Sequence, residues 1–224
     1  MIGGKSWDDL CEKVERLLDV YEQWHLSISV EKSGWGMSQV EYLGHNASVR
    51  GLQAKPKNVE SLMTLEFPRP LKGLQAFLGS RNYYHRLIAD FALATKPEDR
   101  GHEEWEHAVR AFEVLKSKLA TAPILKHFDS GREVVVTVYA NDWASSGVLA
   151  QVHDDVCMPV KFTSRTLKPN ERNYDIVEKA ILAVLRVLNG CYAMLAERSI
   201  RVLTRHTTLA WPFRSKGLQG RLSQ

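Results

Sequence analysis

The sequence lacks the features that mark several large classes of protein. It has three cysteines, Cys11, Cys157 and Cys191, and no Cys-x-x-C spacing. This argues against a disulfide framework or a cysteine zinc site and predicts reduced, buried thiols. No apolar run approaches the roughly 20 residues of a membrane span, and the N-terminus has no apolar signal-peptide stretch. The sequence therefore predicts an intracellular protein, cytoplasmic or nuclear, with no membrane partner.

Hydrophobic and charged residues are present in ordinary amounts. The 224 residues are 44% hydrophobic and 25% charged, a composition typical of folded chains with one large or two small domains. The formal net charge is only +4, but residues 195–224 carry six cations and one anion. This C-terminal stretch is either a contact for nucleic acid or a solvated basic surface.

Apolar residues near the N-terminus recur with a helical period. They predict an amphipathic helix over residues 7–23 with Ser6 as its N-cap, and its apolar face is expected to pack against another element. Alternating residues at 26–30 and the β-rich run at 40–49 predict two strands joined by a turn, with Gly51 ending the pair. The sequence of the N-terminal part therefore predicts a helix followed by a hairpin.

After the predicted hairpin, prolines mark a change from strand-forming to helix-forming sequence. Pro56 and the pair Pro68 and Pro70 bracket a short helix near residues 58–65, because proline disfavours helix at the residue before it. Two longer helical stripes follow, at 71–88 and 105–119. We therefore place a boundary near residue 54 and expect residues 55–122 to be mainly helical.

The sequence after residue 122 begins with predicted strands. Three β-rich runs predict an antiparallel meander, at 133–140, 146–153 and 158–163. A long helix is predicted over residues 171–188, a strand over 200–204 and a short helix from about His206. Three strands, a helix, a strand and a helix is the order of an RNase H-like mixed sheet. The fold class expected for the whole chain is α+β (mixed α/β).

Short motifs occur along the chain in a definite order. They are VEYLGH at 40–45, FLGSRNYYHRLI at 77–88, Trp105 before Ala111-Phe112, SRTL at 164–167, ERNY at 171–174, and TRH at 204–206. Together they resemble the polymerase polyprotein of gypsy-type (Ty3-like) LTR retrotransposons and its retroviral relatives. The resemblance implies the end of a reverse transcriptase palm at 1–54, a thumb and connection at 55–122, and an RNase H-like domain lacking its last elements at 123–224.

The resemblance also implies catalytic carboxylates that this sequence does not supply. Polymerisation in the family requires an aspartate pair on a palm hairpin, whereas Asp8-Asp9 falls inside the first predicted helix. The nuclease of the family uses carboxylates that hold two Mg²⁺ ions. Three matching positions carry Tyr139, Ala180 and Arg205, and a fourth would fall beyond the C-terminus. We therefore expect neither activity, no metal site and no cofactor.

Two acidic residues lie near these degenerate positions. Glu178 is two residues from Ala180, a rotation of about 200° on a helix, so it is expected to face away. Asp142 is offset by three from Tyr139, which on a strand points to the other face. An alignment gap that places Asp142 at the first ligand position leaves open an active RNase H with relocated ligands.

Cations interleaved with aromatic residues predict contacts with nucleic acid, because in the family the thumb holds template and primer. The candidates are Lys55, Lys57, Arg69, Lys72, Arg81, Tyr83, Tyr84, Arg86, Arg201, Arg205 and Arg214. A helical bundle with core aromatics and solvated cations explains the same pattern equally well.

The function expected from the resemblance is a retrotransposon-derived reverse transcriptase and RNase H-like fragment. We expect it to be catalytically inactive and to retain weak binding of RNA–DNA hybrid or duplex nucleic acid. Two alternatives stay open. One is the active RNase H with relocated ligands. The other is a protein-interaction module that pairs with a partner chain through an open sheet edge.

Overall fold

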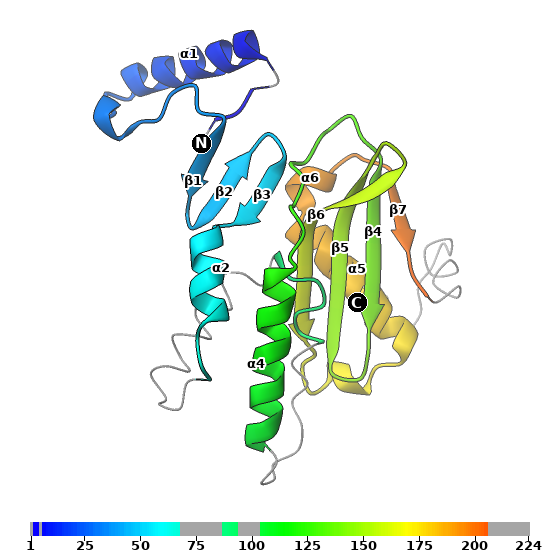
Figure 1. Cartoon of the computed structure of the whole chain (residues 1–224). Helices are drawn as coiled ribbons and strands as arrows, with labels where there is room; N and C mark the ends of the chain where they lie inside the picture. Colours follow the sequence, from blue (N-terminus) through cyan, green and yellow to red (C-terminus); the bar gives the residue numbers. More distant parts are fainter. Residues whose placement is uncertain (1, 5, 68–86, 94–103, 206–224) are drawn as a thin grey trace.

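The computed structural model describes residues 2–4, 6–67, 87–93 and 104–205 (Figure 1). Most of the helix predicted over 71–88, and the short helix predicted from about His206, lie outside the described residues. No helix within those ranges is both long enough and apolar enough to cross a membrane.

Helix α1 spans Trp7–Gln23, as predicted, and the Ser6 hydroxyl caps it by accepting the Asp9 N–H at 3.2 Å. The expectation that its apolar face packs against another element is wrong for the described residues. No side chain of α1 is buried, and Trp7 is 66% exposed. Figure 1 shows α1 set apart from the rest of the molecule, above the first sheet.

The first sheet has three antiparallel strands in the order β1-β2-β3, which span Gln39–Tyr42, His45–Ser48 and Gly51–Ala54. The run predicted as one strand folds into a hairpin, because Leu43 and Gly44 adopt φ of 47° and 68°, the left-handed pair that closes a two-residue turn. The strand predicted at 26–30 is absent, and a single 3₁₀ turn, η1, forms at Val30–Lys32.

Gly51 starts strand β3 instead of ending the predicted pair. Its φ is +134°, and a Cβ at this position would lie 2.1 Å from the Leu125 carbonyl oxygen. That close approach lets Leu52 and Leu125 exchange two backbone hydrogen bonds, of 2.7 and 2.9 Å. The bridge joins the first sheet to the C-terminal half of the chain.

Two helices occupy the described middle of the chain. Helix α2 spans Pro56–Met63 with proline at its first turn, where a missing N–H costs no hydrogen bond, and α4 spans Glu104–Ala120. The two helices touch each other. A core behind them is made of Leu87, Ile88, Phe91, Leu115, Leu119, Leu125 and Phe162. This core connects α4 to the second sheet.

The second sheet confirms the predicted meander and has the order β6-β5-β4-β7. Strands β4, β5 and β6 span Val134–Ala140, Ala144–His153 and Val156–Thr166 and pair antiparallel. Strand β7, Ile200–Leu203, pairs parallel to β4. The parallel partner arrives through helix α5, Ile176–Gly190, and the short α6, Tyr192–Leu195, as a parallel connection requires a crossover.

Helix α5 starts five residues later than predicted. Asp175 and Glu178 form a capping box, in which each carboxylate accepts the backbone N–H of the other residue. The preceding Glu171–Asn173 forms a separate 3₁₀ turn, η3. A capping box satisfies two otherwise unpaired N–H groups at a helix start, so the helix begins at this pair.

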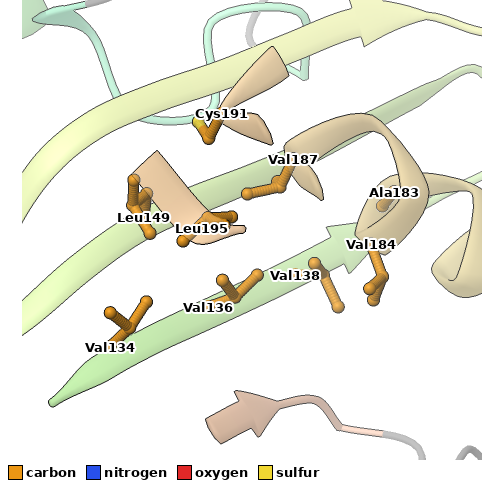
Figure 2. Close-up of a cluster of buried hydrophobic side chains, with 9 residues drawn as sticks. All are labelled: Val134, Val136, Val138, Leu149, Ala183, Val184, Val187, Cys191 and Leu195. Atoms are coloured by element: carbon orange, nitrogen blue, oxygen red, sulfur yellow. The ribbon is translucent and has the colours of Figure 1, made fainter. Parts of the chain in front are cut away.

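One face of the second sheet is covered by α5 through a layer of branched side chains (Figure 2). The layer consists of Val134, Val136, Val138, Leu149, Ala183, Val184, Val187, Cys191 and Leu195. On β5 the contact is closest at Gly147, where a Cβ would lie 2.3 Å from the Val187 Cγ2. A glycine here therefore sets how closely the helix approaches the sheet.

The cysteines differ from the prediction of buried thiols. Cys11 and Cys157 are exposed, because they lie on the isolated helix α1 and on the edge strand β6. Cys191 is buried in the core below α5, and this burial raises the pKa of its thiol, with Lys161 opposing the effect. It therefore remains a neutral thiol in the core.

We expect Gly147→Ala to destabilise the protein by about 1–3 kcal/mol, because the added methyl group overpacks the contact with Val187. Val187→Ala makes room for that methyl, so the double variant should lose less stability than the sum of the single variants. Urea denaturation of the four proteins measures this coupling. Gly190→Ala is the matched control, since nothing lies within 4 Å of its added Cβ. Strict additivity would contradict the contact.

Candidate functional site

Two of the three degenerate nuclease positions lie side by side on the second sheet. Strands β4 and β7 run parallel, with Thr137 opposite Leu203, so the residues two further along, Tyr139 and Arg205, are also neighbours. The Arg205 Cζ lies 5.0 Å from the centre of the Tyr139 ring. This is the geometry of a cation–π contact, and it holds a guanidinium on the face of the phenol.

Tyr139 and Arg205 both line a cavity of about 490 Å³ on the face of the sheet opposite α5. Among its described lining residues, Asp90 is the one carboxylate. The Asp90 Oδ1 accepts a hydrogen bond of 2.6 Å from the Ser146 hydroxyl. The cavity therefore combines one engaged acid with one stacked cation.

Ala180 does not join them in this cavity. It lies on α5 with 1% of its surface exposed, in a small cluster with Ile181 and Val177. Helix α5 packs on Val138, and Tyr139 points to the other face because successive strand residues alternate. The structure thus brings together two of the three positions that the resemblance singled out.

The nearby acids are already engaged elsewhere. The Asp142 side chain is 93% exposed, and its Oδ1 lies 3.5 Å from the Nζ of the buried Lys179. Asp142 lies in the turn after β4 ends at Ala140, so the predicted strand alternation does not apply to it. The Glu178 carboxylate accepts the Asp175 N–H as part of the capping box.

The cavity does not fit the Mg²⁺ ions that the resemblance implies. Across the described ranges, no group of three or more His, Cys, Asp or Glu side chains is placed to hold a metal ion. Magnesium requires several oxygen ligands, commonly including one or two carboxylates. Asp90 is a single carboxylate already bonded to Ser146, and the Arg205 charge beside it repels cations.

The candidate nucleic-acid contacts fall into separate places. Lys55 caps α2 and its Nζ lies 2.6 Å from the Glu41 Oε2, while Lys57 is exposed in the first turn of that helix. Arg201 and Arg205 are on and just after β7, and the Arg201 Nε is 3.2 Å from the Glu133 Oε1. Figure 1 shows α2 below the first sheet and β7 at the far edge of the second.

The remaining seven candidates lie outside the part of the chain that the structure describes. They are Arg69, Lys72, Arg81, Tyr83, Tyr84, Arg86 and Arg214.

Comparison with known proteins accounts for this arrangement. A family model described as the RNase H-like domain found in reverse transcriptase matches residues 105–202. Residues 105–202 therefore form an RNase H-like domain of the kind found in reverse transcriptase. Its homologues are polyproteins of gypsy-type LTR retrotransposons, which confirms the resemblance.

The polyprotein from transposon opus of Drosophila melanogaster is 27% identical over 242 residues, covering 100% of this chain and 24% of that polyprotein. The transposon Tf2-3 polyprotein of Schizosaccharomyces pombe is 28% identical over 218 residues, covering 93% of this chain and 16% of the relative. The chain thus spans less than a quarter of the length of these curated relatives.

Two solved structures of the foamy viral protease-reverse transcriptase share the fold. The dRH protein in complex with double-stranded DNA superposes with a TM-score of 0.69 and 18% identity, covering 97% of this chain and 40% of that chain. The complex with an RNA/DNA hybrid gives 0.68 and 18%, covering 99% and 32%. The α+β fold expected from the sequence is confirmed.

Within the RNase H-like domain, a nearly buried ion pair connects two of the motifs. Arg165 of the SRTL motif contacts both carboxylate oxygens of Glu171 in the ERNY motif, and the Lys168 N–H donates to Glu171 Oε2 at 2.7 Å. Burial alone would raise the pKa of Glu171, but the bonds from Lys168 and Arg165 outweigh it and hold this pKa below its usual value. Sequence reasoning had recognised both motifs but not their contact.

Gln151 is a second residue whose role sequence reasoning missed. It is fully buried, and its side-chain amide forms two hydrogen bonds with the backbone of Asp129. The amide oxygen accepts the Asp129 N–H at 2.8 Å and the amide nitrogen donates to the Asp129 carbonyl at 2.7 Å. This pair of bonds fixes the loop before β4 against the end of β5.

We expect Glu171→Gln to lower the free energy of unfolding at neutral pH by about 1–3 kcal/mol, because Arg165 loses a charged partner. The pKa of Glu171 is depressed in the folded state, so its contribution is present above the unfolded pKa of about 4.3 and is lost as pH falls through the lower folded pKa.

Chemical denaturation at a series of pH values from neutral to acidic checks this expectation. The wild-type protein should lose stability more steeply than Glu171→Gln as pH falls below about 5. Glu113→Gln is the control, since Glu113 is exposed and 3.4 Å from Lys116, and such pairs contribute less than about 1 kcal/mol. Parallel curves for the wild type and Glu171→Gln would refute the role of the ion pair.

Proposed function

We propose that the chain binds RNA–DNA hybrid or duplex nucleic acid weakly and does not cleave it. The observation that carries this proposal is the Arg205 guanidinium stacked 5.0 Å from the centre of the Tyr139 ring. These are two positions at which the resemblance implies metal-binding carboxylates. A stacked arginine presents N–H donors to a phosphate without any metal ion.

Support for nucleic acid as the ligand comes from the fold and the charges. The foamy viral enzymes with this fold were solved in complex with double-stranded DNA and with RNA/DNA hybrid. Arg201 and Arg205 are exposed on the same side of the β7 segment, two residues to either side of Leu203. Cations on one side of a strand can contact phosphates of the same backbone.

The absence of cleavage follows from the charge at the cavity. Hydrolysis of a phosphodiester by two metal ions needs carboxylates that gather those ions. Tyr139 and Arg205 supply a phenol and a positive charge, and Asp90 already accepts the Ser146 hydroxyl. A divalent cation in this cavity would meet repulsion from the guanidinium.

The alternative of a nuclease with relocated ligands is disfavoured by the position of Asp142. The Asp142 carboxylate is 93% exposed, and within the described residues it belongs to no group of three or more side chains that could hold a metal ion. Hydrolysis by two metal ions needs several carboxylates that gather those ions, and one exposed acid does not supply them.

Of the two edge strands of the second sheet within the described residues, β6 is poorly suited to pair with another chain, whereas β7 bears the open edge that this alternative requires. Strand β6 contains Pro159, which has no N–H to offer a partner strand. The Pro159 carbonyl already accepts the Lys126 N–H at 2.8 Å.

Electrophoretic mobility of a labelled hybrid at low and raised salt tests the proposal. We expect a shift that weakens steeply between about 50 and 200 mM salt, since phosphate binding releases counterions. Arg205→Ala should weaken binding about three- to tenfold at low salt. Lys13→Ala is the control, because Lys13 lies on the isolated helix α1 and pairs with Asp9. A shift insensitive to salt, or no shift, would reject nucleic-acid binding.

Incubation of the same hybrid with Mg²⁺ or Mn²⁺ tests the second half of the proposal. The hybrid should stay intact over the time in which an active ribonuclease H control degrades it. Cleavage that disappears in Asp142→Asn would establish the relocated nuclease instead.

A further inference from the structure

A basic cavity lies at the opposite end of strand β4 from Tyr139. It has a volume of about 580 Å³ and lies between the loop before β4, the end of β5 and the segment after α6. We refer to it as the loop pocket, and its charged and imidazole lining residues are Lys126, His127, Asp129, Arg132, His153 and Arg198. Arg198 belongs to the basic stretch at 195–224 that the sequence analysis singled out, and the other five residues were not candidates from the sequence.

We infer that the loop pocket binds a phosphate group, and we assign that group to the backbone of the bound nucleic acid. The assignment to a backbone rests on the function proposed above. The binding of phosphate itself rests on the charges, the geometry and the imidazole of the pocket, which are independent of Tyr139 and Arg205.

Positive charge dominates the lining. Lys126, Arg132 and Arg198 face a single carboxylate, Asp129. The Asp129 Oδ1 accepts the Gly131 N–H at 3.0 Å, and its Oδ2 lies 3.4 Å from the Arg132 Nε. The Lys126 ammonium has no hydrogen-bond or ion-pair partner within the described part of the chain. A positive charge therefore remains available to an anion.

The pocket is held in place before any ligand arrives. Gln151 fixes the loop through its two hydrogen bonds to the Asp129 backbone. The Arg198 guanidinium stacks 5.3 Å from the centre of the Phe128 ring and donates to the Ser130 carbonyl. Side chains that are already ordered lose less conformational entropy on binding, which favours affinity.

The His153 imidazole at the loop pocket is sensitive to the electrostatic potential of the pocket. Burial, followed by the charges of Arg132 and Lys126, lowers the pKa of His153, while Asp154 and Asp129 oppose this effect. Within the described residues, the buried His153 Nε2 has no hydrogen-bond partner. An anion in the pocket would offset the positive charges, so its arrival must raise the pKa of His153.

The loop pocket can act together with the cavity at Tyr139 on one nucleic acid. Arg132 and Arg198 also line a neighbouring cavity with Arg201, Glu133 and Glu197, in which the Arg201 Nε lies 3.2 Å from the Glu133 Oε1. Tyr139 comes seven positions after Arg132, which is about 23 Å along an extended chain. This is shorter than one helical turn of a duplex, about 34 Å.

Titration of the full chain with inorganic phosphate, followed by NMR of the His153 ring, tests the inference. Chloride at equal ionic strength corrects for screening. We expect phosphate to raise the pKa of His153, and Lys126→Met to weaken the apparent phosphate affinity about three- to tenfold. Lys126→Met keeps the apolar stem and removes a charge that has no partner, so the fold should persist, as the remaining spectrum will show.

Arg110→Ala is the matched control, because Arg110 is an exposed cation on α4 paired with Glu106 at 3.4 Å. It should change neither phosphate binding nor the affinity for a hybrid. Lys126→Met should also weaken hybrid binding about three- to tenfold in the mobility assay at low salt.

The outcomes separate this inference from the proposed function. A His153 pKa that phosphate does not move would overturn the loop pocket, and salt-sensitive hybrid binding in the same preparation would leave the proposed function standing. A phosphate response without any effect of Lys126→Met on hybrid binding would overturn the assignment to a backbone and identify free phosphate as the ligand. A phosphate response in a chain that binds no hybrid would likewise reject the nucleic-acid source.

Discussion

The arrangement of the C-terminal half depends on the packing of helix α5 against the centre of the second sheet. Val184 and Val187 lie on the valines of β4, and Gly147 on β5 leaves the space that Val187 fills. Because α5 is also the crossover that returns the chain to the sheet, this packing determines where β7 can pair. The contact between Tyr139 and Arg205 is therefore a result of core packing on the opposite face.

The interactions that hold the C-terminal domain together are separate from the two residues of the candidate site, Tyr139 and Arg205. The layer of valines, the Arg165–Glu171 pair and the Gln151 bonds maintain the RNase H-like fold without any contribution from a metal ion. Tyr139 and Arg205 lie outside that framework, on the exposed face.

The periodic spacing of apolar residues predicted the long helices and strands well, but it predicted where they begin and end poorly. Helices α1 and α4 and the strands of the meander were predictable because many apolar residues repeat at one period. The hairpin at 40–49 was taken for one strand because its turn depends on a positive φ at Leu43, a conformation that leucine rarely adopts. The start of α5 is set by two side-chain hydrogen bonds at Asp175, which apolar spacing does not report.

The candidate site was predictable only in part. The spacing of motifs identified Tyr139 and Arg205, but their contact depends on the parallel register of β4 and β7, which no local pattern encodes. Lys126, His153 and Arg198 come from three segments far apart in the sequence. Each is an ordinary polar residue in its own segment, so only the folded chain reveals them as neighbours.

The bridge between Leu52 and Leu125 has a consequence for how this protein can vary. Its two hydrogen bonds use main-chain atoms alone, so they are indifferent to which side chains stand at those two positions. The constraint falls instead on the adjacent Gly51, where the carbonyl oxygen leaves no space for even one carbon atom. The backbone bridge between the two halves of the chain thus depends on Gly51, a residue that contributes no side chain to it.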